Sequence, residues 1–160
     1  MSTTKNKLTE SPRLTVAETL NYRLADAIAL QTQVKQAYWN VKGPNFVGLR
    51  SLFDEISDAL LRYIDLIAER VVQLGAIAEG TAKVAVQRSK LKPYPLEILS
   101  GTAHCRALSS ALATFADLLR QGDEGIDLVG DKVTSDIYME ISRGVDRWLW
   151  FVEAHLQAES

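Results

Sequence analysis

The sequence predicts an all-α protein: a four-helix bundle with one long crossover between its second and third helices. Apolar residues recur at spacings of three and four through four separate segments, which is the period of an amphipathic helix. The link between the first two segments, residues 43–45, is short, so these two helices should form an antiparallel hairpin. Residues 76–99 make a long connection containing two prolines, as expected of a crossover to the other end of the bundle.

Length and composition indicate a single globular domain. The chain has 160 residues, of which 47% are hydrophobic and 24% charged, so we expect neither a disordered chain nor a membrane protein. No apolar run approaches the roughly 18 residues that a membrane-spanning helix needs. The net charge of −2 does not favour nucleic-acid binding by the whole surface. A lone cysteine, Cys105, and an N-terminus without the apolar stretch of a secretory signal predict a cytoplasmic protein.

Residues 1–14 are predicted to form a flexible arm before the bundle domain, which we place at residues 15–158. The arm is polar and carries three cations, Lys5, Lys7 and Arg13. It is therefore mildly basic, and any DNA binding through it should be weak.

The first helix is predicted to begin at a capping box formed by Thr15 and Glu18. It should end at Gly43 and Pro44, because glycine permits a C-terminal cap and proline cannot continue the helix. The residues predicted to form its buried face are Val16, Leu20, Leu24, Ala27, Leu30, Val34, Tyr38 and Val41.

The second helix, residues 49–74, organises the rest of the chain. Its predicted apolar face consists of Leu49, Leu52, Phe53, Ile56, Leu60, Tyr63, Ile64, Ile67, Val71 and Leu74. At about 100° per residue, a second stripe falls on one narrow arc of the same helix. This stripe, which we call the carboxylate seam, consists of Arg50, Asp54, Asp58, Asp65 and Glu69.

Helix geometry limits what the carboxylate seam can bind. With a rise of about 1.5 Å per residue, Asp54 lies roughly 16 Å from Asp65 and roughly 22 Å from Glu69. One metal ion cannot span those distances within one helix, but a second copy running antiparallel would place its Asp65 and Glu69 opposite Asp54. The alternative is an ordinary solvated face with local pairs such as Asp58 with Arg62.

Gly75 should end the second helix, and a short helix at residues 82–87 is predicted within the crossover. Residues 83–92 contain four cations and no acid, which we interpret as a solvated loop in preference to a nucleic-acid site.

The third helix is predicted at residues 102–119, with an extension to Val129 left open. An acid-rich turn at residues 121–131 should lead to the fourth helix. The residues predicted to pack from the fourth helix are Val133, Ile137, Ile141, Val145, Trp148, Val152 and Leu156.

Three stretches of the chain resemble the Dps family, the mini-ferritins of bacteria. They read QAYWNVKGPNFVGLRSLFDEISDALLRYIDLIAERVVQLG, EGTAKVAVQRSKLKPYPLEI and DIYMEISRGVDRWLWFVEAHLQ. They are spread from residue 36 to residue 157, and WNVKGPNF followed by FDEI and DxxAER is a specific pattern. The resemblance implies a ferritin-like bundle and a hollow shell of twelve subunits.

The resemblance also implies a function. In such shells iron(II) is oxidised between two-fold-related subunits, and ferric mineral collects inside. The family's carboxylate ligands correspond to Asp54, Asp65 and Glu69, which the resemblance makes the metal-binding and catalytic residues. The bound ion would be iron, or another divalent metal such as zinc. Trp39 stands where the family keeps an aromatic residue beside the iron, although a core-filling role is the alternative.

Two positions depart from the family pattern. The family usually has histidine where this chain has Tyr38 and again where it has Arg50. A neutral imidazole binds iron(II) without adding charge, whereas a phenol ionises only near pH 10 and a guanidinium stays protonated. We therefore expect iron oxidation to be altered or weakened, and Arg50 to pair with seam carboxylates.

Acids between the third and fourth helices lie where family members line a three-fold pore, and the candidates are Asp127, Asp131 and Asp136. The alternative for Asp131 is a helix N-cap. His104 and His155 are interpreted as surface or core residues. Three functions remain open: an iron-sequestering and DNA-protecting shell, a non-catalytic protective or DNA-binding dodecamer, and a container whose interface holds an Arg50 ion pair.

Overall fold

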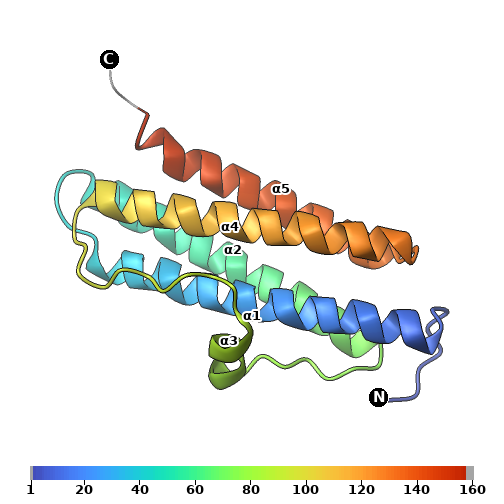
Figure 1. The fold of residues 1–160 in the computed structure, drawn as a ribbon. Coiled ribbons are helices and arrows are strands. Elements are labelled where there is room, and N and C mark those ends of the chain that lie inside the picture. The colour runs from blue at the N-terminus through green and yellow to red at the C-terminus, as the bar shows by residue number, and fades with distance from the viewer. Residues whose placement is uncertain (1, 158–160) are drawn as a thin grey trace.

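A computed structural model describes residues 2–157, which fold into an all-α bundle (Figure 1). The helices are α1 (Glu10–Asn40), α2 (Phe46–Gln73), α3 (Ala82–Arg88), α4 (Gly101–Leu128) and α5 (Lys132–Ala154). Among the described residues there is no strand, only an isolated bridge between Lys42 and Ser100. No helix in that part of the chain is long and apolar enough to cross a membrane.

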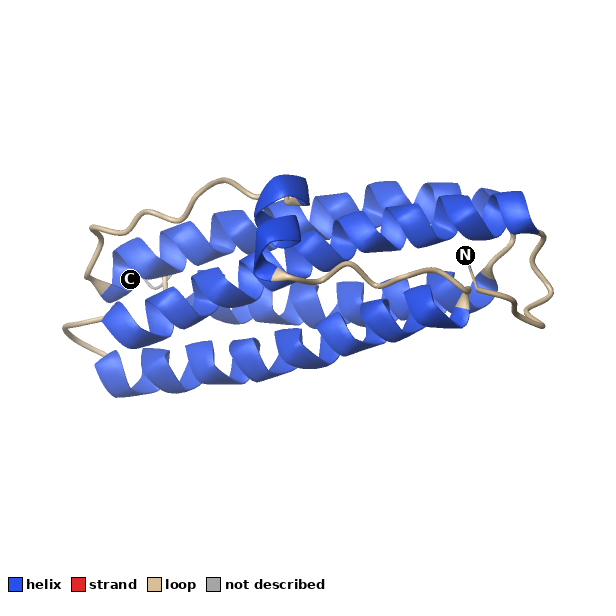
Figure 2. Cartoon of the chain, turned by 90° about the horizontal axis from the view of Figure 1, so that it is seen from below, coloured by secondary structure: helices blue, strands red, loops and turns tan. Residues whose placement is uncertain are grey.

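The four long helices lie side by side as two antiparallel hairpins, α1 with α2 and α4 with α5 (Figures 1 and 2). The crossover leaves the end of α2, places α3 against the outside of α1, and reaches α4 at the other end of the bundle. This arrangement confirms the predicted bundle with its long crossover and its short helix.

The predicted apolar faces form the core. The largest fully buried side chains include Leu20, Leu24 and Leu30 of α1, Phe53 and Ile56 of α2, Phe115 of α4 and Tyr138 of α5. One predicted core position is wrong, because Val133 is 56% exposed in the first turn of α5.

The start of α1 corrects the capping-box prediction. The helix begins at Glu10, and the backbone of Thr9 is extended at the N-cap position. Pro12 is tolerated here because the first helical N–H groups have no partner inside the helix. The Thr15 hydroxyl donates to the Ser11 carbonyl within the helix, so Thr15 is not a cap.

The junction of α4 and α5 corrects a second prediction. The acid-rich stretch expected to be a turn continues α4 as far as Leu128, so the open extension to Val129 is close to the observed end. Gly130 adopts a positive φ of 74°, and Asp131 then caps α5 by accepting from the Thr134 N–H at 3.2 Å. The N-cap alternative for Asp131 is confirmed.

A buried carboxylate fastens the middle of the crossover to α1. Asp26 is fully buried, and it accepts hydrogen bonds from the Ser89 hydroxyl and the Lys90 N–H. Arg23 pairs with Asp26 at 3.1 Å and also donates to the Leu118 carbonyl of α4. This fastening fixes the crossover against α1 and ties α1 to the second hairpin.

Candidate functional site

The carboxylate seam lies along α2 as predicted, with its members at different degrees of exposure. Asp65 and Glu69 are exposed, and within residues 2–157 neither forms an ion pair. Asp54 is half-exposed and lies 3.6 Å from Lys35 Nζ of α1. The predicted pair of Asp58 with Arg62 is absent from the described part of the chain.

The two unusual residues of the seam region are in contact with each other. The Arg50 guanidinium lies over the Tyr38 ring, 4.2 Å from its centroid, and Lys35 Nζ lies 4.2 Å from the same centroid. We call these residues, together with Asp54, the Tyr38 cluster. Within one chain Arg50 therefore contacts an aromatic ring, and no seam carboxylate pairs with it among residues 2–157.

Lys35 is the residue of this cluster that sequence reasoning missed. It lies three residues before Tyr38 on α1, so the two side chains share a face of the helix. Its approach to Asp54 depends on how α1 packs against α2, which the sequence pattern does not give. The helical spacing to Tyr38 was the only signal that could have indicated it.

The donor set of a single chain does not suit a transition metal. Among residues 2–157, no group of three His, Cys, Asp or Glu side chains is close enough to hold one. The cationic groups of Lys35 and Arg50 each lie 4.2 Å from the centroid of the Tyr38 ring, and positive charge there opposes the approach of iron(II). Any metal site built from Asp54, Asp65 and Glu69 requires a second copy of the chain.

Trp39 does not fill the core. Its side chain is 64% exposed on α1, next to the Tyr38 cluster in sequence. The core-filling alternative is wrong, and Trp39 is free to contact another molecule or subunit.

The three pore candidates fall into two groups. Asp127 and Asp136 are exposed at the end of α4 and the start of α5. Asp131 is buried, with its Oδ1 atom 2.9 Å from Arg70 Nη2, and it also accepts from the Thr134 hydroxyl. Arg70 Nε donates in turn to the Thr134 hydroxyl oxygen at 2.9 Å, so this carboxylate is engaged within the chain.

Comparison with known proteins identifies the family. Residues 17–160 match the family model described as the ferritin-like domain. The chain is 41% identical to the DNA protection during starvation protein of Agrobacterium fabrum, over 98% of this chain and 97% of that protein. The chain belongs to the Dps family.

Solved Dps structures share the whole fold. Mycobacterium smegmatis Dps is 28% identical and superposes with a TM-score of 0.94, covering all of this chain and 91% of that one. DpsC from Streptomyces coelicolor is 26% identical, also at a TM-score of 0.94, covering 99% of this chain and 93% of that one. The ferritin-like bundle predicted for this chain is thereby confirmed.

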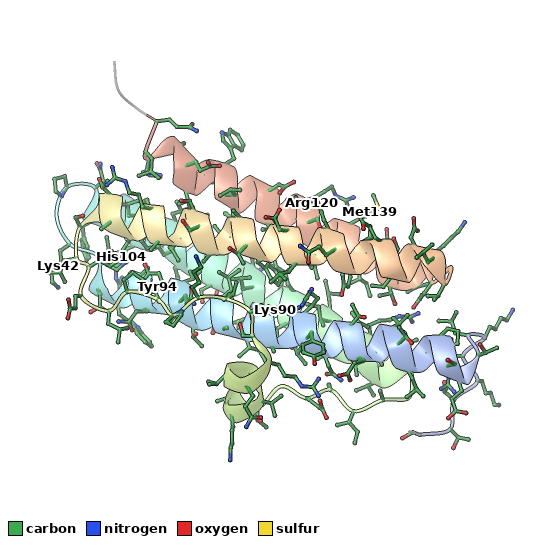
Figure 3. The ribbon with its side chains drawn as sticks, viewed as in Figure 1. Lys42, Lys90, Tyr94, His104, Arg120 and Met139 are labelled. Carbon is green, nitrogen blue, oxygen red and sulfur yellow. The ribbon has the colours of Figure 1, made fainter. Side chains whose placement is uncertain are left out.

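The two histidines of this Dps chain have different surroundings. His104 is 1% exposed at the start of α4, and its Nδ1 atom shares a 2.6 Å hydrogen bond with the Tyr94 hydroxyl (Figure 3). Burial lowers the pKa of His104 and raises the pKa of Tyr94. His155 is exposed after α5, and its Nδ1–H donates to the Phe151 carbonyl at 2.9 Å. His104 is a core residue and His155 a surface residue; the sequence indicated one or the other for each without deciding between them.

The three candidate cations of the N-terminal segment are also divided. Lys5 and Lys7 are exposed before α1. Arg13 lies in the first turns of α1 and donates from its Nη1 atom to the Leu74 carbonyl at the end of α2. The Ser2 N–H donates to the Gly75 carbonyl nearby. Of these three cations, the two lysines are therefore the ones available to a polyanion.

Proposed function

We propose that this chain forms a homododecameric Dps shell that sequesters iron and protects DNA from oxidative stress, with weakened oxidation of iron(II). In this proposal the shell is a cytoplasmic bacterial protein, and its weakly basic N-terminal segment allows it to associate with the nucleoid. Membership of the Dps family supports the shell and the sequestration. The observation that carries the weakened oxidation is the Arg50 guanidinium over the Tyr38 ring, at the two positions where the family usually has histidine.

The physical reason is a loss of ligands together with a gain of positive charge. An imidazole at either position would offer iron(II) a neutral nitrogen ligand. Arg50 offers no lone pair, and Lys35 already occupies one side of Asp54. Iron(II) at Asp54, Asp65 and Glu69 would then depend on three carboxylates beside two fixed cations. We expect the ion to bind weakly there and to be oxidised slowly; zinc, if it binds instead, faces the same charges.

Iron entry is proposed at the turn between α4 and α5. Asp127 and Asp136 are exposed there and can attract cations, whereas Asp131 is buried in its pair with Arg70. Asp131 would therefore hold the start of α5 in place beside a pore, and its carboxylate would not face the passing ions.

The alternative is a non-catalytic dodecamer that protects or binds DNA without oxidising iron. The Tyr38 cluster also supports this alternative, because its positive charges would prevent iron(II) from binding at the seam if they repel the ion completely. The two functions differ in whether the wild-type shell oxidises iron(II) faster than a solution of the ion without protein.

Stopped-flow absorbance of iron(II) oxidation, with oxygen and with peroxide, tests the proposal. Replacing both departures, Tyr38→His with Arg50→His, should raise the initial rate at least tenfold over the wild type. Asp65→Ala should lower the small wild-type rate only slightly. Arg106→His is the matched control, because Arg106 is an exposed arginine of α4, in the other helical hairpin.

Two results would contradict weakened oxidation. One is a wild-type rate equal to that of the double variant. The other is a fast wild-type rate abolished by Asp65→Ala. Together they would mean that three carboxylates and Tyr38 form a working site without histidine.

A further inference from the structure

The unpaired charges of the seam are complementary between two copies of the chain. In one copy, Arg50 is exposed and has no carboxylate partner within residues 2–157. Asp65 and Glu69 are exposed at the other end of the same helix and lack cationic partners in that part of the chain. These charges cannot meet within one helix, because about 22 Å of rise separates Arg50 from Asp65.

One helix register brings these charges together. Two identical helices that cross antiparallel about a two-fold axis pair residues in reverse order. Arg50 precedes Asp54 by four residues, and Glu69 follows Asp65 by four. A register that sets Asp54 opposite Asp65 of a second copy therefore also sets Arg50 opposite Glu69 of that copy.

The Tyr38 cluster prepares the cationic side of this contact. Stacking on the Tyr38 ring restricts the Arg50 side chain, which lowers the entropy lost when its guanidinium pairs with a carboxylate. Lys35 lies beside Asp54 and supplies a positive charge there. Without that charge, Asp54 and the Asp65 of the second copy would face each other as two carboxylates and repel.

We infer that Arg50 and Lys35 replace the metal as the cations that join two copies across the seam. Arg50 pairs with Glu69 of the second copy, and Lys35 bridges its own Asp54 and Asp65 of the second copy. The two-fold axis produces both contacts twice. This inference rests on the proposed Dps shell, and it predicts that the two-fold interface assembles without any metal and weakens in salt.

Sedimentation velocity of the full chain after treatment with EDTA tests the interface. The wild type should sediment at a mass near twelve times 17.7 kDa at low salt. Arg50→Glu should raise the protein concentration of half-dissociation at least tenfold, and Arg50→Gln should do so to a smaller extent. The exchange Arg50→Glu with Glu69→Arg should restore assembly, because it reverses both charges and leaves opposite signs facing each other.

The controls separate this inference from the proposed function. Arg106→Glu makes the same charge change on α4, away from the seam, and should leave assembly unchanged. Far-UV circular dichroism checks that every variant is folded. If Arg50→Glu and Arg50→Gln both assemble as well as the wild type, the proposed ion pairs across the seam are wrong, while the shell itself stands. The same conclusion follows if the exchange variant is folded but does not assemble. A wild type that is monomeric at every salt concentration, with or without iron, would overturn the shell itself.

Discussion

At the scale of single residues, the buried surroundings of the His104 ring determine its protonation and its access to ligands. His104 is enclosed at the start of α4, where Tyr94 is its hydrogen-bond partner at Nδ1 and its Nε2 atom is buried without one. Cys105, the next residue, is fully buried, and burial raises its pKa to about 11. Neither side chain can act as a metal ligand or nucleophile without local opening of the bundle.

His104 should make stability depend on pH. Burial lowers its pKa in the folded chain, whereas the unfolded chain titrates near the ordinary value of about 6.5. The unfolded state therefore binds the proton more readily, and the stability present above about pH 6.5 falls as the pH drops below it. Urea unfolding at pH 7.5 and pH 5.5 should show a smaller loss for His104→Gln than for the wild type.

His155→Gln is the control for that experiment, because His155 is exposed and its ring bonds to the Phe151 carbonyl at the end of its own helix. Equal losses of stability in the wild type and His104→Gln would mean that His104 is not the group responsible.

At the scale of helices, local sequence signals predicted most of the fold but placed some ends wrongly. The Gly75 end of α2 and the Asp131 cap of α5 depend on residues adjacent in sequence, so they could be predicted. The start of α1 could not, because Arg13 of its first turns bonds to the distant Leu74 carbonyl of α2. The Tyr38 cluster was hidden for the same reason: Lys35 and Arg50 meet at Tyr38 only through the packing of α1 on α2.

The junction of α2 and α5 should be sensitive to the loss of one carboxylate. Asp131→Ala removes the cap of α5, which costs about 1 kcal/mol, and leaves the buried guanidinium of Arg70 without its anion, which costs about 3–5 kcal/mol. Thermal or urea unfolding should therefore show a loss of at least about 3 kcal/mol. Asp136→Ala, an exposed acid of the same helix, should change stability by about 0.5 kcal/mol or less. A similar small loss for both variants would contradict the buried pair.

At the scale of the whole molecule, the seam and the N-terminal segment carry exposed charges that are available to a second molecule: Asp65 and Glu69 in the seam, and Lys5 and Lys7 before α1. The family resemblance predicted the metal-binding carboxylates and the two positions without histidine, whereas the exposure of the described residues shows which of these charges another molecule can reach. Within residues 2–157, Asp65, Glu69 and Arg50 form no ion pair, whereas Arg88 of the basic segment at residues 83–92 is paired with Glu79 and Glu18. This pairing leaves one fewer cation in the segment for binding a nucleic acid, which weakens that alternative.

DNA binding by the assembled shell should be weak and steeply salt-dependent. Among the described residues before α1, the exposed cationic side chains are Lys5 and Lys7, so each subunit neutralises few phosphates, and affinity depends on many subunits acting together. Lys5→Glu with Lys7→Glu should remove most binding in an electrophoretic mobility assay at low salt. This substitution is preferable to deleting residues 1–13, which would also remove the Arg13 contact to Leu74. Undiminished binding by the variant would direct attention to Lys83 and Lys92.

The hydrogen bonds from Ser89 and Lys90 to Asp26 also affect how many residues can be inserted into the crossover. Because Ser89 and Lys90 are fastened near the middle of the connection, it behaves as two short loops in place of one long one. Lengthening a loop costs little, about 0.6 kcal/mol for each doubling, and here any added residues would lengthen one half only. Insertions before Ala82 or after Leu91 should therefore change only the loop in which they are made, and α3 should remain packed against α1.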